Sequence, residues 1–247
     1  EEIWRYSRIN ELDMSKFANG KLTTTVEGGE GVQLTGAAAT ALVGAGMHVQ
    51  PDMFARLNTD TPDVIALQIG KNKVHTQTVV ITHSVDKSGV VAYPRLVIDA
   101  AENSEIVVVE RFTSADNVHS LVVPVVEVHA AQSARVTYLA INELGKNTWQ
   151  IGHQVAVGER DSNVRLFTVA LGGGYARMRD EVRLVGQGAS AQQTALYFAD
   201  GTQMHDFRTL QSHEAPRTHS DLLFKGAVKD TSKSVYTGLI KITENGT

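Results

Sequence analysis

Short runs of alternating apolar and polar residues fill most of the chain from Thr23 onward. An apolar pair two residues apart recurs as Leu96/Ile98, Val126/Val128, Val155/Val157 and Val182/Leu184. A serine follows each pair five or six residues later, and these serines, Ser104, Ser133, Ser162 and Ser190, are 28 or 29 residues apart. Because a second strand-like run follows each serine, the pattern predicts a repeated unit of strand, corner and strand.

The second runs of the unit are rich in Val, Ile, Leu and Thr. They are Ile106 to Glu110, Val136 to Ile141, Val164 to Leu171 and Thr194 to Phe198, and a fifth unit holds Leu222 to Val228 and Val235 to Ile242. A unit with one apolar face cannot bury it alone, so successive units have to stack with equivalent residues above one another. The repeats therefore predict an all-β fold, a β-solenoid, without the helices that a βαβ fold needs. Some units align only with one-residue slips, which leaves the direction of individual side chains open.

The first residues depart from this pattern. Charged and aromatic residues such as Trp4 and Tyr6 predict a short helical or irregular arm over residues 1–22, followed by a β-helix core over residues 23–247. The chain stops soon after the strand-like run that ends at Ile242. We therefore interpret the sequence as a fragment of a longer protein.

The composition narrows the possible functions. The formal net charge is −4 with both signs interspersed, so neither nucleic acid nor an anionic membrane surface is expected as a partner. No window approaches the ~20 apolar residues of a membrane span, which favours a cytoplasmic protein. The sequence contains no cysteine, and this excludes disulfides, thiolate nucleophiles and Cys-ligated zinc or iron–sulfur sites within these residues.

One glycine-rich corner, Gly186 to Ala191, fits the loose dinucleotide pattern G-x-G-x-x-G/A. Its context fails, because Thr194 to Phe198 predicts another strand where a phosphate-binding helix should begin. Neither a Walker A sequence nor a G-x-S-x-G elbow is present. We therefore assign no catalytic and no cofactor-binding residue, and we expect any ATPase to be a separate partner chain.

Nine histidines raise the question of a metal site, for which His205, His213 and His219 are weak candidates. In one straight strand, about 3.3 Å per residue would place His205 and His213 about 26 Å apart, too far for one metal ion. They could converge only through a turn or a neighbouring coil, so we assign no metal ligand. Glu127 and His129 share a strand face as an acid–base pair might, but with Val126 and Val128 inward both are expected on the solvent side.

The last third of the chain carries a specific signature. It is HDFRTLQSH from His205, APRT from Ala215, SDLLFKGAV from Ser220 and SKSVYTGLI from Ser232. This sequence resembles the SufB/SufD family of iron–sulfur cluster assembly proteins, closely over His205 to Ile242 and more loosely over Arg95 to Phe198. The first residues are similar to the family's E-E-W-R-Y start, with Ile3 inserted. The lack of cysteine and the SDLLFKG segment are more similar to SufD than to SufB.

The resemblance implies a right-handed parallel β-helix flanked by mostly helical regions, in a SufB–SufC–SufD complex on which iron–sulfur clusters form. SufC is the ATPase of that complex, so a SufD-like chain is expected to be a non-catalytic scaffold that carries no resident cofactor in this fragment. The family's SufC-binding helical region and its His-Gly-Ala-Thr segment lie beyond the strand matching Val235 to Ile242, so no catalytic residue is transferred. Exposed edge strands at the end of the β-helix are expected to pair with SufB or with a second copy as a dimer.

Two other functions of β-solenoids stay open from the residues alone. A carbohydrate-active β-helix enzyme such as a polysaccharide lyase needs clustered charges in a groove and usually aromatic platforms, whereas only 6% of these residues are aromatic. Binding or cleavage of an acidic polysaccharide would favour that enzyme. A structural adhesin would need an export signal, which the charged and aromatic first residues do not form.

Overall fold

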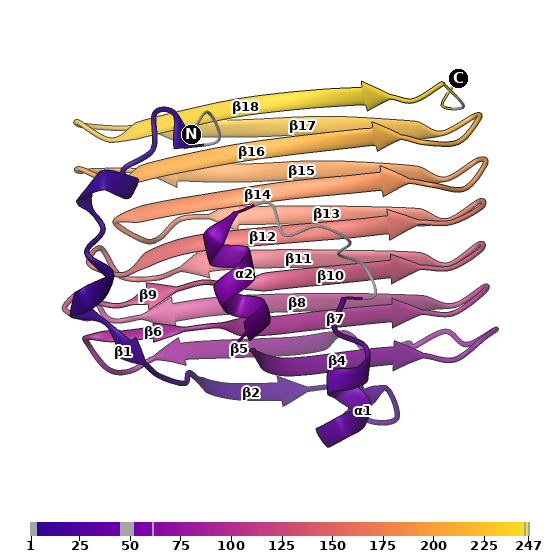
Figure 1. Cartoon of the computed structure of the whole chain (residues 1–247), viewed down its shortest axis with the longest axis horizontal. Helices are drawn as coiled ribbons and strands as arrows, with labels where there is room; N and C mark the ends of the chain where they lie inside the picture. Colours follow the sequence, from indigo (N-terminus) through magenta and orange to yellow (C-terminus); the bar gives the residue numbers. More distant parts are fainter. Residues whose placement is uncertain (1–3, 45–51, 61, 245, 247) are drawn as a thin grey trace.

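The computed structural model describes residues 4–44, 52–60, 62–244 and 246, which form a flattened β-solenoid of about six turns (Figure 1). Its described strands make two sheets. Sheet A contains β1 (Ala18–Asn19), β3 (Gln33–Leu34), β4 (Asp63–Ile69), β6 (Val90–Ala92), β7 (Pro94–Ala100), β9 (Leu121–Val122), β10 (Val125–Ala130), β12 (Trp149–Gly158), β14 (Tyr175–Leu184), β16 (Met204–His213) and β18 (Lys233–Ile242). Sheet B contains β2 (Thr23–Glu27), β5 (Val79–Val85), β8 (Glu105–Ser114), β11 (Arg135–Glu143), β13 (Asn163–Ala170), β15 (Ser190–Ala199) and β17 (His219–Val228).

Parallel pairing between equivalent strands of successive coils holds the stack together. In sheet A, β10 pairs with β7 and β12 on its two sides, and in sheet B, β11 pairs with β8 and β13. The inward apolar side chains of both sheets join into one continuous cluster that runs from Leu67 to Ala191. This stacking in register confirms the β-solenoid that the repeats predict.

The register corrects the sequence alignment of the third coil by one residue. Val126 pairs with Gln154 and Val128 with Ala156, so the equivalents of the first apolar pairs are not Val155 and Val157. Val155 and Val157 point out of the lumen, where they are nevertheless 3% and 6% exposed. Since both faces of β12 are buried, alternation of apolar residues does not mark which face is inside.

The feature that repeats at each corner is a backbone conformation and not the serine. The residue two positions before each strand of sheet B has a positive φ in five successive corners: Asn103 at 56°, Ser133 at 58°, Asp161 at 55°, Gly188 at 75° and Arg217 at 57°. Non-glycine residues adopt this left-handed region uncommonly, so its recurrence indicates that the corner geometry is required in every coil. Ser133 is therefore equivalent to Asn103, one residue before Ser104.

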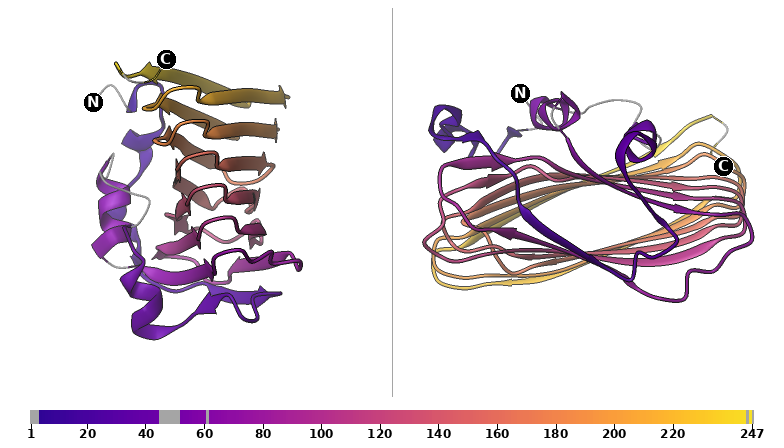
Figure 2. Two further views of the ribbon diagram at one scale, coloured as in Figure 1. Left: turned by 90° about the vertical axis from the view of Figure 1, so that its right-hand side faces the viewer. Right: turned by 90° about the horizontal axis from the view of Figure 1, so that it is seen from below.

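The N-terminal segment covers the outer face of sheet A, as both views in Figure 2 show. It contains the 3-10 helices η2 (Ile9–Glu11) and η3 (Met14–Lys16) and the helices α1 (Gly36–Ala41) and α2 (Met53–Asp60). Ala39 of α1 packs against Ala66 and Val97, and Phe54 of α2 joins the outer cluster that includes Ile151. The sequence pattern does not predict α1 and α2, because both are short and α1 is built from Gly, Ala and Thr. Among the described helices, none has both the length and the apolar character that crossing a membrane requires.

Candidate functional site

The last coil, made of β17 and β18, leaves apolar side chains open to solvent. Ile240 and Ile242 occupy lumen positions in the rows of Val182 and Leu184, which are each 1% exposed. Ile240 and Ile242 are both 64% exposed, because no described coil lies above them. The other large exposed apolar side chains on these two strands are Leu223, Val228, Tyr236 and Leu239.

Both strands of the last coil also have a free backbone edge within the part of the chain that the structure describes. β18 pairs with β16 and β17 pairs with β15, each on one side. At the opposite end of the solenoid, β2 and β3 pair antiparallel with β5 and β4. Ten-residue edge strands beside exposed apolar side chains are a template for strand addition, so this end of the β-helix is the candidate interaction surface.

An open groove of about 520 Å³ lies on the outer face of sheet A next to β18. Arg177, Arg179 and Arg208 line it together with Leu239. Arg177 and Arg208 both pair with the buried carboxylate of Asp206, at 2.6 and 3.0 Å, and Arg179 pairs with Glu181. The groove extends the apolar end surface with three arginines that share two carboxylates, Asp206 and Glu181.

The three candidate metal histidines are not brought together as a group. His205 and His213 lie at opposite ends of the single strand β16, and His219 begins β17. His205 is buried, with Nε2 3.2 Å from the carbonyl oxygen of Gly172, and its desolvation lowers its pKa. Within the described residues, no group of three or more His, Cys, Asp or Glu side chains is arranged to hold a metal ion.

His213 belongs to a hydroxyl network at the corner before β17. Its Nδ1 lies 2.7 Å from the hydroxyl of Thr218 and its Nε2 lies 2.9 Å from the hydroxyl of Ser220. The Thr218 hydroxyl donates to the carbonyl of Ala215, so it accepts from Nδ1–H, and Nε2 accepts from Ser220. Desolvation lowers the pKa of His213, with a smaller contribution from His219, which favours this neutral form. The network fixes the corner and occupies both ring nitrogens.

The glycine-rich corner is a close approach of two backbones and does not lead into a helix. A side chain at Gly186 would place its Cβ 1.9 Å from the backbone nitrogen of Arg160 in the coil below. Gly188 occupies the left-handed corner position, and β15 begins at Ser190. The strand predicted over Thr194 to Phe198 is confirmed as part of β15, so the corner is not followed by the helix that the dinucleotide motif needs.

Glu127 does not lie on the solvent side, contrary to what sequence analysis predicts. It points away from the lumen but is 0% exposed, and it forms an ion pair with the buried Arg95. Asn58 of α2 accepts from Arg95 Nη1 at 2.9 Å, and the backbone N–H of Gly44 donates to Glu127 Oε2 at 2.9 Å. The alternation along β10 correctly predicts an outward direction, but it carries no information about the helices that cover this face.

The surface residues of the last coil could not be singled out from the sequence. Ile240 and Ile242 alternate in the same way as the buried residues of earlier coils, so the pattern predicts core positions for them. Their exposure follows from their place in the last described coil, which no single residue encodes.

Residues 80–247 match the family model described as "SUF system FeS cluster assembly, SufBD core domain". The matched region begins in β5 and includes both strands of the exposed last coil.

Three relatives extend this comparison. An iron–sulfur cluster assembly SufBD family protein of Mycobacterium tuberculosis (strain ATCC 25618 / H37Rv) is 32% identical over 243 residues, which are 93% of this chain and 58% of that protein. Iron–sulfur cluster assembly protein SufD of Bacillus subtilis (strain 168) is 26% identical over 179 residues, covering 71% of this chain and 41% of that protein. SufD of Plasmodium berghei (strain Anka) is 29% identical over 167 residues, covering 67% of this chain and 12% of that protein. The chain thus spans about 58% of the length of the mycobacterial relative.

Proposed function

The chain belongs to the SufBD family of the SUF system for iron–sulfur cluster assembly, and from this premise we propose that it is a SufD-like, non-catalytic scaffold subunit of that system in the cytoplasm. Two relatives that carry the name SufD support the choice of this subunit type. The absence of cysteine from the sequence supports a scaffold that does not itself supply thiolate ligands. The cluster is the cargo of the whole assembly and not a resident cofactor of this chain.

The partner at the exposed end of the β-helix is a SufB-like protein. Another chain that extends the sheets at β17 and β18 would pair two ten-residue edges and cover Ile240 and Ile242, which are otherwise exposed lumen residues. Such an addition converts an open lumen into a continuous one and satisfies the free backbone groups. A homodimer through the same end is the arrangement expected of the isolated chain.

The ATPase of the system is a separate, SufC-like chain. The stacked coils form one stiff body, because every coil is hydrogen-bonded to the next along both sheets. A conformational change of an ATPase attached elsewhere on the full-length protein is therefore transmitted as a rigid-body displacement to the paired end.

Size-exclusion chromatography with light scattering tests this function on the full-length protein mixed with SufB and SufC homologues. We expect one complex that contains all three chains. The double substitution Ile240→Asp and Ile242→Asp should remove SufB from the complex, because two charges would be buried at the joint.

The matched control is Leu196→Asp. Leu196 is an apolar residue on β15 that is 57% exposed, but it lies on the outer face of sheet B and not in the last coil. It should leave the complex intact. The proposed function fails if the three unaltered chains never elute together, and the assignment of the end surface fails if both variants behave alike.

A further inference from the structure

One column of inward side chains in the β-helix changes from apolar to polar toward the C-terminal coils. One inward column of sheet A runs through Leu96, Val126, Gln154, Asp180 and Thr209, each paired in register with the next. Polar side chains thus replace aliphatic ones from β12 onward. Burying a polar group costs free energy unless the group is hydrogen-bonded or paired with a charge, so these polar side chains are expected to have binding partners.

Asp180 is the central member of this column. It is 3% exposed, and its Oδ1 has no hydrogen-bond partner. The two arginines that precede Asp180 on the outer face of β14, Arg177 and Arg179, pair with Asp206 and Glu181. No ion pair to Asp180 occurs among the described side chains, and burial, with a smaller effect of Glu181, raises the pKa of Asp180 to about 7. An ionised carboxylate here lacks the compensating charge that buried ions require.

Two amide side chains present further free oxygens at the same level of the lumen. Gln154 is the direct register partner of Asp180, one strand spacing of about 4.8 Å away, and neither atom of its amide has a partner. Gln193 approaches Asp180 from β15, because its Nε2 donates to the backbone carbonyl of Asp180 at 3.0 Å. The Oε1 of Gln193 has no partner. Both glutamines are 1% exposed. Three buried oxygen-bearing side chains therefore lie at neighbouring inward positions of the lumen.

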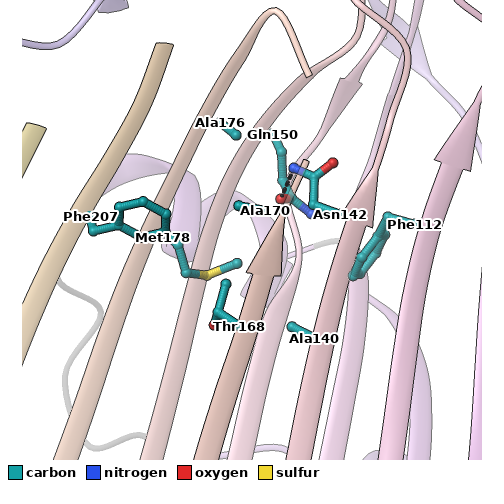
Figure 3. A pocket seen from close by; sticks show the side chains of 9 residues that line it. All are labelled: Phe112, Ala140, Asn142, Gln150, Thr168, Ala170, Ala176, Met178 and Phe207. Carbon is teal, nitrogen blue, oxygen red and sulfur yellow. Dashed lines mark hydrogen bonds between the residues drawn. The ribbon is translucent and has the colours of Figure 1, made fainter. Parts of the chain in front are cut away.

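A small cavity of about 10 Å³ lies in the lumen at the inward positions that precede this column (Figure 3). Met178 and Phe207, which line it, precede Asp180 and Thr209 by two residues on the same strand faces. Gln150 donates no hydrogen bond from its Nε2 there, while Asn142 donates to its Oε1 at 2.7 Å. The cavity is large enough for about one water molecule. On the side of the open end, the hydroxyls of Thr209 and Tyr236 lie 2.9 Å apart.

We propose that the carboxylate of Asp180 and the amide oxygens of Gln154 and Gln193 bind a monovalent metal cation inside the β-helix. One carboxylate with neutral oxygens balances a single positive charge, whereas a divalent ion would leave a buried excess charge. Oxygen donors suit hard cations. The cation stabilises the C-terminal coils, which are the coils that present the exposed end, by satisfying groups that otherwise remain without partners.

Thermal unfolding of the full-length protein tests this site in NaCl, KCl and tetramethylammonium chloride at equal ionic strength, at a pH of about 8. Tetramethylammonium screens charge but is too large for the site. We expect the melting temperature in NaCl or KCl to be higher than in tetramethylammonium chloride by roughly 4 °C. This increase should reach a plateau as the metal salt replaces tetramethylammonium chloride. Identical melting temperatures in the three salts overturn the proposal and leave a protonated Asp180 or a water as the occupant.

Asp180→Asn and Asp221→Asn form the matched pair of variants. The first substitution keeps the size of the Asp180 side chain but removes its charge, so the shift between salts should disappear. Asp221 is exposed on β17, and its substitution should leave the shift intact. A shift of the same size in Asp180→Asn overturns the site.

Crystals of the unaltered protein soaked in thallium(I) provide the measurement that does not depend on a variant folding. Tl⁺ replaces Na⁺ or K⁺ at oxygen sites and scatters anomalously. We expect a peak between the side chains of Gln154, Asp180 and Gln193. If Tl⁺ gives anomalous peaks at other places in the crystal but none between these three side chains, the proposal is contradicted.

Discussion

Glu127 illustrates how a single residue can be correctly oriented by the sequence pattern and still be misjudged in its environment. It alternates with Val126 and Val128 and so points out of the lumen, yet it is as fully buried as they are. The helices of the N-terminal segment cover this part of sheet A, and Asn58 of α2 hydrogen-bonds to its partner Arg95. The hydrogen bonds of Asn58 and Gly44 to this ion pair therefore tie the N-terminal segment to the β-helix.

Substituting Glu127→Gln should lower the free energy of unfolding by about 3–5 kcal/mol, because Arg95 would stay buried without its counter-charge. Urea unfolding followed by circular dichroism measures this difference. The control is Glu105→Gln, which removes the partner of Arg135 from a pair with 53% and 40% exposed side chains and should cost at most about 1 kcal/mol. Equal losses in the two variants would contradict the structural role of the buried pair.

A polar clamp connects the strands of sheet A across successive coils. His129 on β10 places Nδ1 2.8 Å from Asp99 on β7 and Nε2 3.1 Å from Glu159 after β12. Gln68 on β4 donates to the other oxygen of Asp99 at 2.9 Å. The hydrogen bond to Asp99 raises the pKa of His129 and lowers that of Asp99, so the clamp favours the charged forms of both groups.

The clamp predicts a pH-dependent stability. Because the pKa of His129 is raised in the folded state, its stabilisation is complete below the unfolded-state pKa of about 6.5 and is lost as the pH rises through the folded-state pKa. The pKa of Asp99 is lowered, so its contribution is lost as the pH falls below about 4. His129→Gln should therefore cost about 0.5 kcal/mol more near pH 5.5 than near pH 8.5, a small value because the groups are partly exposed. Urea midpoints at the two pH values measure it, and exposed His119→Gln serves as the control. A loss of stability in His129→Gln that is the same at both pH values would contradict a contribution from the charged form of His129.

The elements themselves were largely predictable, and the residual errors have identifiable causes. The period near 29 residues correctly predicts stacked coils, because burial of one apolar row per coil is visible in the alternation. The period does not reveal the one-residue alignment error at Val155, because β12 is buried on both faces. It does not reveal the alignment error at Ser133 either, because the left-handed corner position is occupied by Asn, Ser, Asp, Gly and Arg in successive coils. The end surface depends on the order of coils, which a local pattern cannot express.

Across the whole molecule, the two ends of the stack differ in how their edges are closed. Antiparallel strands β2 and β3 cover the first regular coils, whereas β17 and β18 each have a neighbour on one side in the described part of the chain. In a stacked repeat structure each coil is stabilised by its neighbours, so the coil with one neighbour opens most easily.

Hydrogen exchange of the chain over residues 1–247 should therefore show faster exchange of the β18 amides than of the β12 amides, which lie between β10 and β14. Adding a SufB homologue should slow exchange in β17 and β18 and leave β2 and β5 unchanged, because strand addition closes only the open end. Protection that spreads equally over both ends, or that appears only at the N-terminal end, would contradict pairing through the last coil. Since each coil supports the next, slower exchange should also extend inward to β15 and β16 and diminish with distance from the joint.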